Sequence, residues 1–519
     1  MADLPAAPAR QVLRGGVVLV GGEPATAVGV EGGRIAFVGS EVDADRWTGT
    51  GEGAPVVTDL DGALVAPAFV DAHVHTVRTG FATTGLDLTG TPTLVGALDA
   101  LAAHAAAAPD AGVLVGQGWD ETDWPESRPP TGAELDRAAP GRRTYVTRVD
   151  GHSSVISPAL ASLVPGLEQL DGWTPDGRVE RDAHHAVRAT LESLISDAER
   201  LDAARAGCRA MATQGIVALH ENAAPHIGPE SEIALVRQAA AETGLHAVVY
   251  WGELMAADTA RRLGVAGLAG DLIADGAFGS RTAALATPYD DAPHTCGHGY
   301  VTAEQVRDHV VACSHAGLQA GFHAIGDAAL EEIATGFELA AAVVGDALCA
   351  LRLEHVELPS PRVVDVIARL GVVCSVQPVF DALWGGPDGM YADRLGERWA
   401  QTNPFAELAR HTTLALGSDS PVTALGPWAA VRAAVHHHAP EHALTPAVAF
   451  AAHTRGGWAA AGQHDRADHL RAGDVADLAV WRTPAALVDG LPDLTPGTEL
   501  PTLVRLLAAG RTVHEGAPA

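Results

Sequence analysis

Short apolar runs alternate with longer alanine-rich stretches through most of this 519-residue chain. The apolar runs are typical of buried strands and the stretches between them have helical composition, so the pattern predicts βα units around a parallel sheet. Eight such strands would close a (β/α)₈ barrel, which carries its chemistry at the carboxyl ends of the strands. The predicted strands are Leu64–Val70, Ile216–His220, Ala247–Tyr250, Leu272–Ala274, Leu318–His323, Leu351–His355, Val372–Val376 and Thr413–Leu416.

The two ends of the chain follow a different pattern. β-Branched runs separated by Gly-Gly turns occupy Val12–Val38, and similar runs recur in Gly473–Trp481 and Leu503–His514. Such runs are typical of strands and hairpins. We therefore predict an α/β chain in three parts. They are a small β-sandwich domain formed by both termini (1–66 with 470–519), a TIM-like barrel (67–469), and an inserted subdomain after strand one (about 81–200), a segment too long for one crossover.

The composition of the chain argues against some classes of binding partner and indicates its location. The formal net charge of −30 at pH 7 argues against nucleic acid or an anionic membrane surface. No apolar run is long enough to cross a bilayer, and the first residues lack the features of a secretory signal, so we expect a cytoplasmic protein. Five scattered cysteines predict no disulfide framework. The oligomeric state, a homodimer included, stays open.

Two histidines follow the first predicted barrel strand. His73 and His75 come directly after the apolar run that ends at Val70. Side chains two apart on a strand project to the same side, so these imidazoles should enter one space. Such a pair suits a borderline-soft cation such as zinc.

Further candidate ligands stand where other strands end. His323 ends strand five, His355 ends strand six, and Asp419 follows strand eight. Because the carboxyl ends of the strands meet at one face of a barrel, these groups can surround one site together with His73 and His75. Imidazole and carboxylate suit a divalent metal, which can lower the pKa of bound water from ~15.7 toward ~7.

The motifs resemble the amidohydrolase superfamily, and within it the YtcJ-like branch that includes N-substituted formamide deformylases. The resemblance implies a metal-bearing barrel beside a β-sandwich, and hydrolysis of a C–N bond in a small amide-type substrate. A deaminase or cyclic-amide hydrolase on the same scaffold, or a non-catalytic barrel relative, is the alternative. The matching segments are PAFVDAHVH (67–75), GQGWDE (116–121), DGH (150–152), ADGAFGSRT (274–282), HAIGD (323–327), EH (354–355), SVQP (375–378), YADR (391–394) and GSDSP (417–421).

The resemblance also assigns roles. It makes His73 and His75 ligands of the more buried metal, and His323 and His355 ligands of a second position. Asp419 contacts metal and transfers the proton of the attacking water, a task that suits a carboxylate.

One departure from the family pattern concerns the metal count. Relatives with two metals bridge them with a carboxylated lysine on strand four, where this chain has Asp271, and the chain contains no lysine at all. Aspartate is too short to reach the same point unless the strand moves inward. Three alternatives stay open: one metal on His73, His75, Asp419 and one further histidine; two metals bridged by water or by Glu221 or Asp271; or a degenerate site.

The remaining candidates each have a structural alternative. His152 can donate to the substrate carbonyl or stabilise a turn. Trp119 and Trp124 can form a substrate wall or pack inside the insertion. Arg281 can meet a substrate anion or brace its loop, and Phe380 and Tyr391 are lesser pocket candidates. His184–His185 and His436–His438 lack strand-end positions, and we expect them on helix surfaces.

Overall fold

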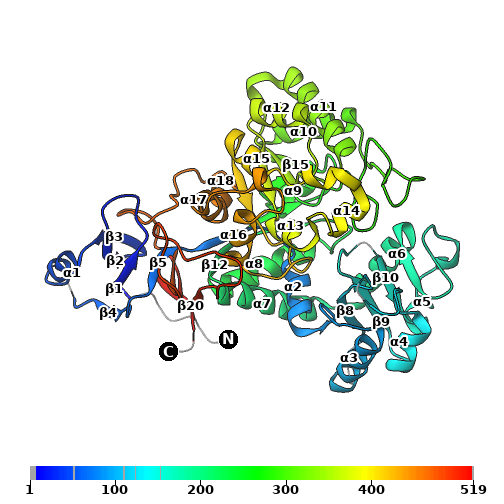
Figure 1. The fold of residues 1–519 in the computed structure, drawn as a ribbon, viewed down its shortest axis with the longest axis horizontal. Coiled ribbons are helices and arrows are strands. Elements are labelled where there is room, and N and C mark those ends of the chain that lie inside the picture. Colours follow the sequence, from blue (N-terminus) through cyan, green and yellow to red (C-terminus); the bar gives the residue numbers. More distant parts are fainter. Residues whose placement is uncertain (1–7, 51–52, 109–111, 123, 152, 517–519) are drawn as a thin grey trace.

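The computed structural model describes residues 8–50, 53–108, 112–122, 124–151 and 153–516. A sheet made from both ends of the chain lies at one end of the molecule, the barrel lies in the middle, and the insertion lies at the other end (Figure 1). Among the described residues, no helix combines the length and the apolar character needed to span a membrane.

The barrel consists of eight parallel strands, and their carboxyl ends face the same side. A bridge between Val74 and Ser420 connects the first strand to the chain that follows the last, which nearly closes the sheet. The α/β barrel prediction is confirmed. In sheet order the strands are β6 (Phe69–Val74), β12 (Ile216–Ala223), β13 (His246–Trp251), β14 (Gly267–Leu268), β15 (Gln319–Ala324), β16 (Leu351–His355), β17 (Val373–Val376) and β18 (Leu414–Leu416).

Two predicted strands differ from the observed ones. The run Leu64–Val70 divides at Ala68 into β5 (Leu64–Pro67), which belongs to the terminal sheet, and β6, which belongs to the barrel. Strand four was placed at Leu272–Ala274, but the paired segment is β14, five residues earlier. Of the predicted segment, Ile273 keeps a single bridge to His323. Gly270, with φ +69°, turns the chain out of the regular strand between the two.

Helices cover the outside of the barrel, and their ends are set by local signals. In α12 (Pro361–Leu370), the Ser360 side chain accepts from Val363 N–H, and Gly371 at φ 65° ends the helix. Such an N-cap contributes about 1 kcal/mol. The other barrel helices are α2 (Thr76–Thr84), α7 (Asp197–Thr213), α8 (Ser231–Thr243), α9 (Ala257–Leu263), α10 (Ala303–Ala316), α11 (Asp327–Val344), α13 (Pro378–Trp384), α14 (Met390–Leu395), α15 (Phe405–His411), α16 (Pro427–Val435), α17 (Pro446–Ala451) and α18 (Gly457–Ala460).

Both ends of the chain build one branched sheet. Strand β5 pairs in parallel with β1 and antiparallel with β19, so it joins the N-terminal and C-terminal parts. This sheet has a hydrophobic core separate from that of the barrel, and the core includes Leu13, Val65 and Leu478. The other elements are β1 (Arg10–Val18), β2 (Ala25–Glu31), β3 (Arg34–Gly39), α1 (Glu41–Thr48), β4 (Val56–Asp59), β19 (Leu478–Arg482), β20 (Thr502–Ala508) and β21 (Arg511–Glu515).

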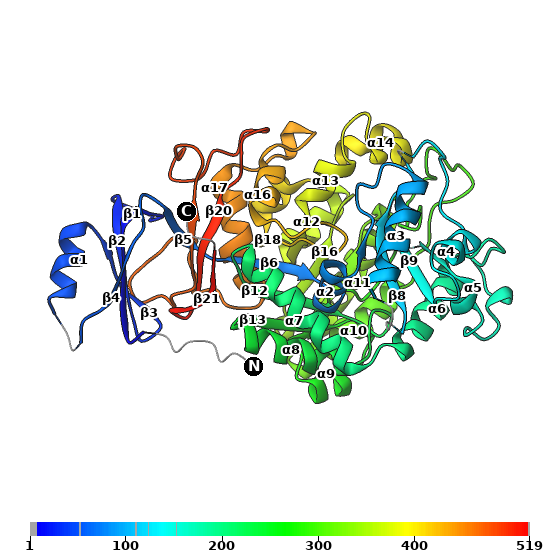
Figure 2. The same cartoon turned by 90° about the horizontal axis from the view of Figure 1, so that it is seen from below.

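The segment after α2 forms a sheet of its own (Figure 2). Its hydrophobic clusters are distinct from the barrel core, and one of them contains Trp119 and Trp124. A salt bridge between Arg78 and Glu192 links this inserted segment to α2. Its elements are β7 (Leu86–Asp87), α3 (Leu94–Ala107), β8 (Leu114–Trp119), α4 (Gly132–Ala138), β9 (Thr144–Arg148), β10 (Ser153–Ile156), α5 (Pro158–Ala161), β11 (Arg178–Glu180) and α6 (Arg181–Leu194).

Candidate metal centre

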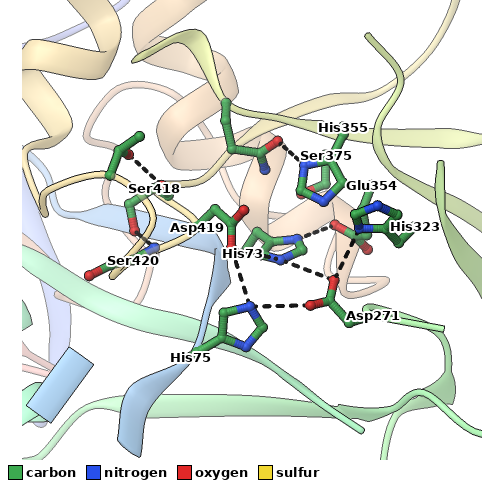
Figure 3. Close-up of polar contacts among 12 residues, drawn as sticks. His73, His75, Asp271, His323, Glu354, His355, Ser375, Ser418, Asp419 and Ser420 are labelled. Atoms are coloured by element: carbon green, nitrogen blue, oxygen red, sulfur yellow. Dashed lines mark hydrogen bonds and ion pairs between the residues drawn. The ribbon is translucent and has the colours of Figure 1, made fainter. Parts of the chain in front are cut away.

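Two histidines and two aspartates meet at the carboxyl end of the barrel (Figure 3). Nε2 of His73 lies 3.3 Å from Asp419 Oδ1 and 3.4 Å from Asp271 Oδ1. Nε2 of His75 lies 3.2 Å from Asp419 Oδ1 and 3.2 Å from Asp271 Oδ2. Each imidazole nitrogen therefore faces both carboxylates. We call these four residues the donor cluster.

The donor cluster has the dimensions of a metal site. Four ligands placed tetrahedrally at the usual zinc distances of about 2.0–2.1 Å are about 3.3–3.4 Å from one another. The distances from the two imidazole nitrogens to Asp419 Oδ1, 3.3 and 3.2 Å, match that spacing, and His73, His75 and Asp419 place their ligand atoms within 4.8 Å of one another. Asp271 faces the two nitrogens with different oxygens, Oδ1 at 3.4 Å from His73 and Oδ2 at 3.2 Å from His75. His73 Nε2 and Asp271 Oδ1 are buried and have no hydrogen-bond partner among the described residues. Buried polar atoms without a partner are costly, so the cluster fits a divalent cation.

Two glycines explain how a side chain as short as Asp271 reaches the cluster. A Cβ on Gly252 would lie 2.6 Å from the carbonyl carbon of Asp271, so this glycine lets the Asp271 backbone approach the end of β13. Gly270, in the left-handed region at φ +69°, redirects the chain immediately before Asp271. These two glycines thus place the Asp271 backbone where its short side chain reaches His73 and His75.

His323 and His355 adjoin the donor cluster, His323 beside Asp271 and His355 beside His73. His323 Nδ1 is 3.7 Å from Asp271 Oδ1. The ring centroids of His323 and His355 are 4.4 Å apart, and those of His73 and His355 are 4.9 Å apart. Ligand atoms of His73, Asp271 and His355 lie within 4.8 Å of one another. The predicted second position therefore shares Asp271 with the donor cluster.

Hydrogen bonds fix two of these imidazoles. His73 Nδ1 donates to Glu354 Oε2 at 2.9 Å, and Arg352 forms an ion pair with the same carboxylate. His355 Nδ1 donates to Gln377 Oε1 at 2.7 Å. A hydrogen bond at Nδ1 leaves the Nε2 lone pair for a metal. Glu354 and Gln377 stood in the sequence motifs, but nothing in the sequence revealed their roles, because each acts on a histidine of another strand.

The backbone at the site is strained. His355 has φ 71° and Asp419 has φ 54°, in the left-handed region that side chains other than glycine rarely adopt. Such residues cost about 1–3 kcal/mol and gather at functional sites. Asp71 Oδ1 accepts hydrogen bonds from Ser418 N–H at 2.9 Å and His73 N–H at 3.2 Å, which holds the Asp419 loop against β6.

The charges within the donor cluster compensate one another. Burial lowers the pKa of His75, but Asp271 and Asp419 more than offset this effect and raise it to about 9. Burial opposes ionisation of Asp419 as well, yet His73 and His75 hold its pKa well below the ordinary value. Two buried carboxylates thus require positive charge nearby. A divalent cation supplies that charge in place of protons on the imidazoles.

Several predicted site residues do not belong to the donor cluster. Glu221 is buried beside the cluster, where its Oε2 accepts from Thr76 N–H at 2.8 Å. Trp119 and Trp124 pack inside the insertion and donate their indole N–H to the carbonyls of Val146 and Thr91. These are the positions of packing residues. His152 lies outside the described residues.

The other pocket candidates have distinct surroundings. Phe380 stacks on His355 with ring centroids 5.9 Å apart and planes at 11°, so it borders the cluster. The Tyr391 hydroxyl donates to Glu357 Oε2 at 2.5 Å, among buried aromatic rings. Arg281 pairs with Asp291 through two bonds of 3.0 and 2.6 Å, which braces its own loop.

Two of the remaining histidines are not surface residues as predicted. His184 is 2% exposed, and its Nε2 is 2.9 Å from the Tyr145 hydroxyl and 2.8 Å from Ser154 Oγ. His437 is 5% exposed and lies 3.5 Å from Asp381. Polar partners inside the fold permit this burial, and a sequence pattern does not reveal such partners.

Comparison with known proteins agrees with this architecture. A family model described as "Amidohydrolase family" matches residues 56–514. The chain is 27% identical over 442 residues to "Putative amidohydrolase YtcJ" of Bacillus subtilis (strain 168), covering 80% of each protein. It is 25% identical over 499 residues to N-substituted formamide deformylase of Arthrobacter pascens, covering 88% of this chain and 90% of that one.

The fold also matches solved structures. An uncharacterized metal-dependent hydrolase from Pyrococcus horikoshii OT3 superposes with a TM-score of 0.75 at 21% identity, covering 93% of this chain and 100% of that one. The resemblance seen in the motifs is confirmed by the family model and the relatives. The chain belongs to the amidohydrolase family, and it is a hydrolase on that ground.

Proposed function

We propose that the protein hydrolyses a C–N bond of a small amide-type substrate, with N-substituted formamides as the first class to test. The donor cluster carries this proposal, because two imidazole nitrogens and two carboxylates converge at the face of the barrel where such enzymes place their chemistry. The relative named N-substituted formamide deformylase supports the choice of bond.

A divalent metal fits the four residues of the donor cluster and, when bound, would supply Lewis acidity and make water nucleophilic near neutral pH. Asp419 has the role that the chemistry then requires of the protein. Its Oδ1 faces the two imidazoles, which leaves Oδ2 to accept a proton from the attacking water and return it to the leaving nitrogen. Burial of Asp419 keeps that proton from bulk solvent.

We infer a single ion in the donor cluster. Asp271 completes a set of four donors, and the chain has no lysine that could bridge two metals. His323 and His355 are then left to contact the substrate, and Phe380 against His355 gives that side an apolar surface. Zinc is the ion that the spacing of the donors favours.

Formate release tests this function. Protein loaded with zinc should release formate from N-benzylformamide, and chelator treatment followed by zinc should remove and restore the activity. Asp419→Asn should abolish turnover, whereas Asp393→Asn, at an exposed position, should not. Near-normal activity of the Asp419 variant, or full activity of verified metal-free protein, would contradict the proposal. Ammonia release from aminated heterocycles, or opening of cyclic amides, would favour the alternative reactions instead.

A further inference from the structure

Helix α6 of the insertion has two different faces. Ala183, Val187 and Leu191 are buried against the insertion's own hydrophobic cluster. Arg188 and Glu192 are one turn apart on another face, as residues four apart on a helix are.

This polar face of α6 is held against the barrel. Glu192 forms an ion pair with Arg78, which lies on α2 three residues after His75. Arg78 also donates to the carbonyl of Ile227, in the loop after β12, at 2.5 Å. Because Glu192 reaches α2, Arg188 on the same face is directed toward the side of the barrel on which the donor cluster lies.

Arg188 is a cation without a partner in the part of the chain that the structure describes. Among the residues that the structure describes, none forms a hydrogen bond or ion pair with its guanidinium, and the residue is only partly exposed. Glu192 is the nearest acid on its own helix, and its two oxygens are already paired with Arg78 and Arg200. A half-buried arginine without an anion is poorly solvated and remains free to bind one.

The surroundings of Arg188 connect it to the donor cluster. Burial and the charge of Arg78 lower its pKa, and Tyr145, Glu192 and Asp271 act in the opposite direction. His226 lies in the loop after β12. Burial and the charge of Arg188 lower its pKa to about 3, whereas Asp271 acts in the opposite direction. His226 is therefore neutral near pH 7, and because Arg78 is paired with Glu192, Arg188 is the unpaired positive charge among the described residues on this side of the cluster. Its neighbour His185 is likewise disfavoured as a cation, chiefly by burial and then by Arg188.

We propose that Arg188 binds a carboxylate of the substrate, so that the preferred substrates are amides carrying an acidic group, such as N-acylated amino acids. This inference rests on the proposed function and narrows its substrate class. A guanidinium offers two parallel N–H donors that match a carboxylate. The chain carries a net charge of −30, so an anionic substrate needs a local positive group to enter the site.

A matched pair of formamides tests the inference. N-Formyl-L-leucine and N-formyl-L-leucinamide have the same scissile bond and differ by one negative charge. With zinc-loaded wild type, kcat/KM from formate release should be at least about tenfold higher for the acid. In Arg188→Met this preference should fall by about 10- to 100-fold, in line with loss of a charge-assisted hydrogen bond. Arg188→Lys should be intermediate, because a single ammonium keeps the charge but not the paired donors.

Arg137→Met is the matched control, because Arg137 lies on α4 of the same insertion with a largely exposed side chain. Its preference should equal that of wild type. An unchanged preference in both folded Arg188 variants, or a wild type that favours the neutral amide, would overturn the inference.

A binding measurement separates failure of this inference from failure of the proposed function. If zinc-loaded wild type releases no formate from either compound, the formamide hydrolysis is wrong. Calorimetric titration of the same wild-type and Arg188→Met proteins with N-formyl-L-leucine then decides the role of Arg188. At least tenfold weaker binding by the variant supports carboxylate recognition, and equal binding, or none by wild type, refutes it.

Discussion

Asp271 is the residue on which the proposed single-metal site depends most. Replacing it by asparagine keeps the size of the side chain and the close packing of its backbone against Gly252, but removes the charge. The carboxylate faces His73 Nε2 at 3.4 Å and His75 Nε2 at 3.2 Å. A neutral amide is a much poorer ligand for a divalent cation, so Asp271→Asn should weaken metal binding selectively.

The size of the effect follows from the position of Asp271. Losing a group that only orients a metal ligand costs about 10- to 100-fold in affinity. A carboxylate within the donor cluster should matter more, so we expect at least about 100-fold, which corresponds to about 2.8 kcal/mol. Metal binding stabilises a folded protein by mass action, so at saturating zinc the variant should lose most of this amount from its unfolding free energy. Without metal the variant should also be less stable than wild type, because the ionised Asp271 carboxylate pairs with His73 and His75 and removing one partner of a buried pair is destabilising. The loss that appears only when zinc is present is the part due to metal binding.

Competition titration of zinc against a chromogenic chelator, with denaturant unfolding in the presence and absence of zinc, measures both quantities. Asp393→Asn on α14 serves as the control for loss of one carboxylate. Zinc affinity of Asp271→Asn within about threefold of wild type would refute the reasoning. In that case Asp271 would be a neighbour of the metal rather than its ligand.

Three other substitutions test the surroundings of the site. Glu354→Gln should weaken zinc binding by about 10- to 100-fold, because the His73 imidazole loses its orienting carboxylate, and unchanged affinity would contradict that role. Trp119→Ala should cost about 3–5 kcal/mol of unfolding free energy while zinc affinity stays constant, since this ring is fully buried in the insertion; a stable variant with altered kcat/KM would instead assign it to the substrate. Burial lowers the pKa of His309 to about 4 from its ordinary value of 6.5, so its contribution to stability is present above pH 6.5 and is lost as the pH falls toward 4. Unfolding free energies of metal-free wild type and His309→Gln should therefore converge by up to about 1.4 kcal/mol per pH unit in that window, and parallel curves would show that His309 does not titrate there.

The strand-end histidines could be predicted from the sequence because two simple rules place them. Alternation along β6 and the residue that follows it aims His73 and His75 to one side, and a parallel barrel gathers the carboxyl ends of its strands. Asp271 was a weaker prediction. Its reach depends on Gly252 and Gly270, whose close contacts with neighbouring strands exist only in the folded chain.

Other features could not be predicted because they depend on contacts distant in sequence. The apolar triplet Leu272–Ala274 has the composition of a strand, yet the pairing lies at Gly267–Leu268, since backbone hydrogen bonds and not composition define the strand. Trp119 and Trp124 suit a pocket wall as well as a core until the insertion's sheet is known. The sequence did not indicate a role for Arg188, because its distinguishing property is the absence of a partner among the described residues.

The position and number of bound ions test the central claim most directly. Anomalous diffraction at the zinc edge, on crystals of the zinc-loaded protein, should show one peak surrounded by His73, His75, Asp271 and Asp419. A chain with no peak at this position, or with its strongest peak between His323 and His355, would contradict the account.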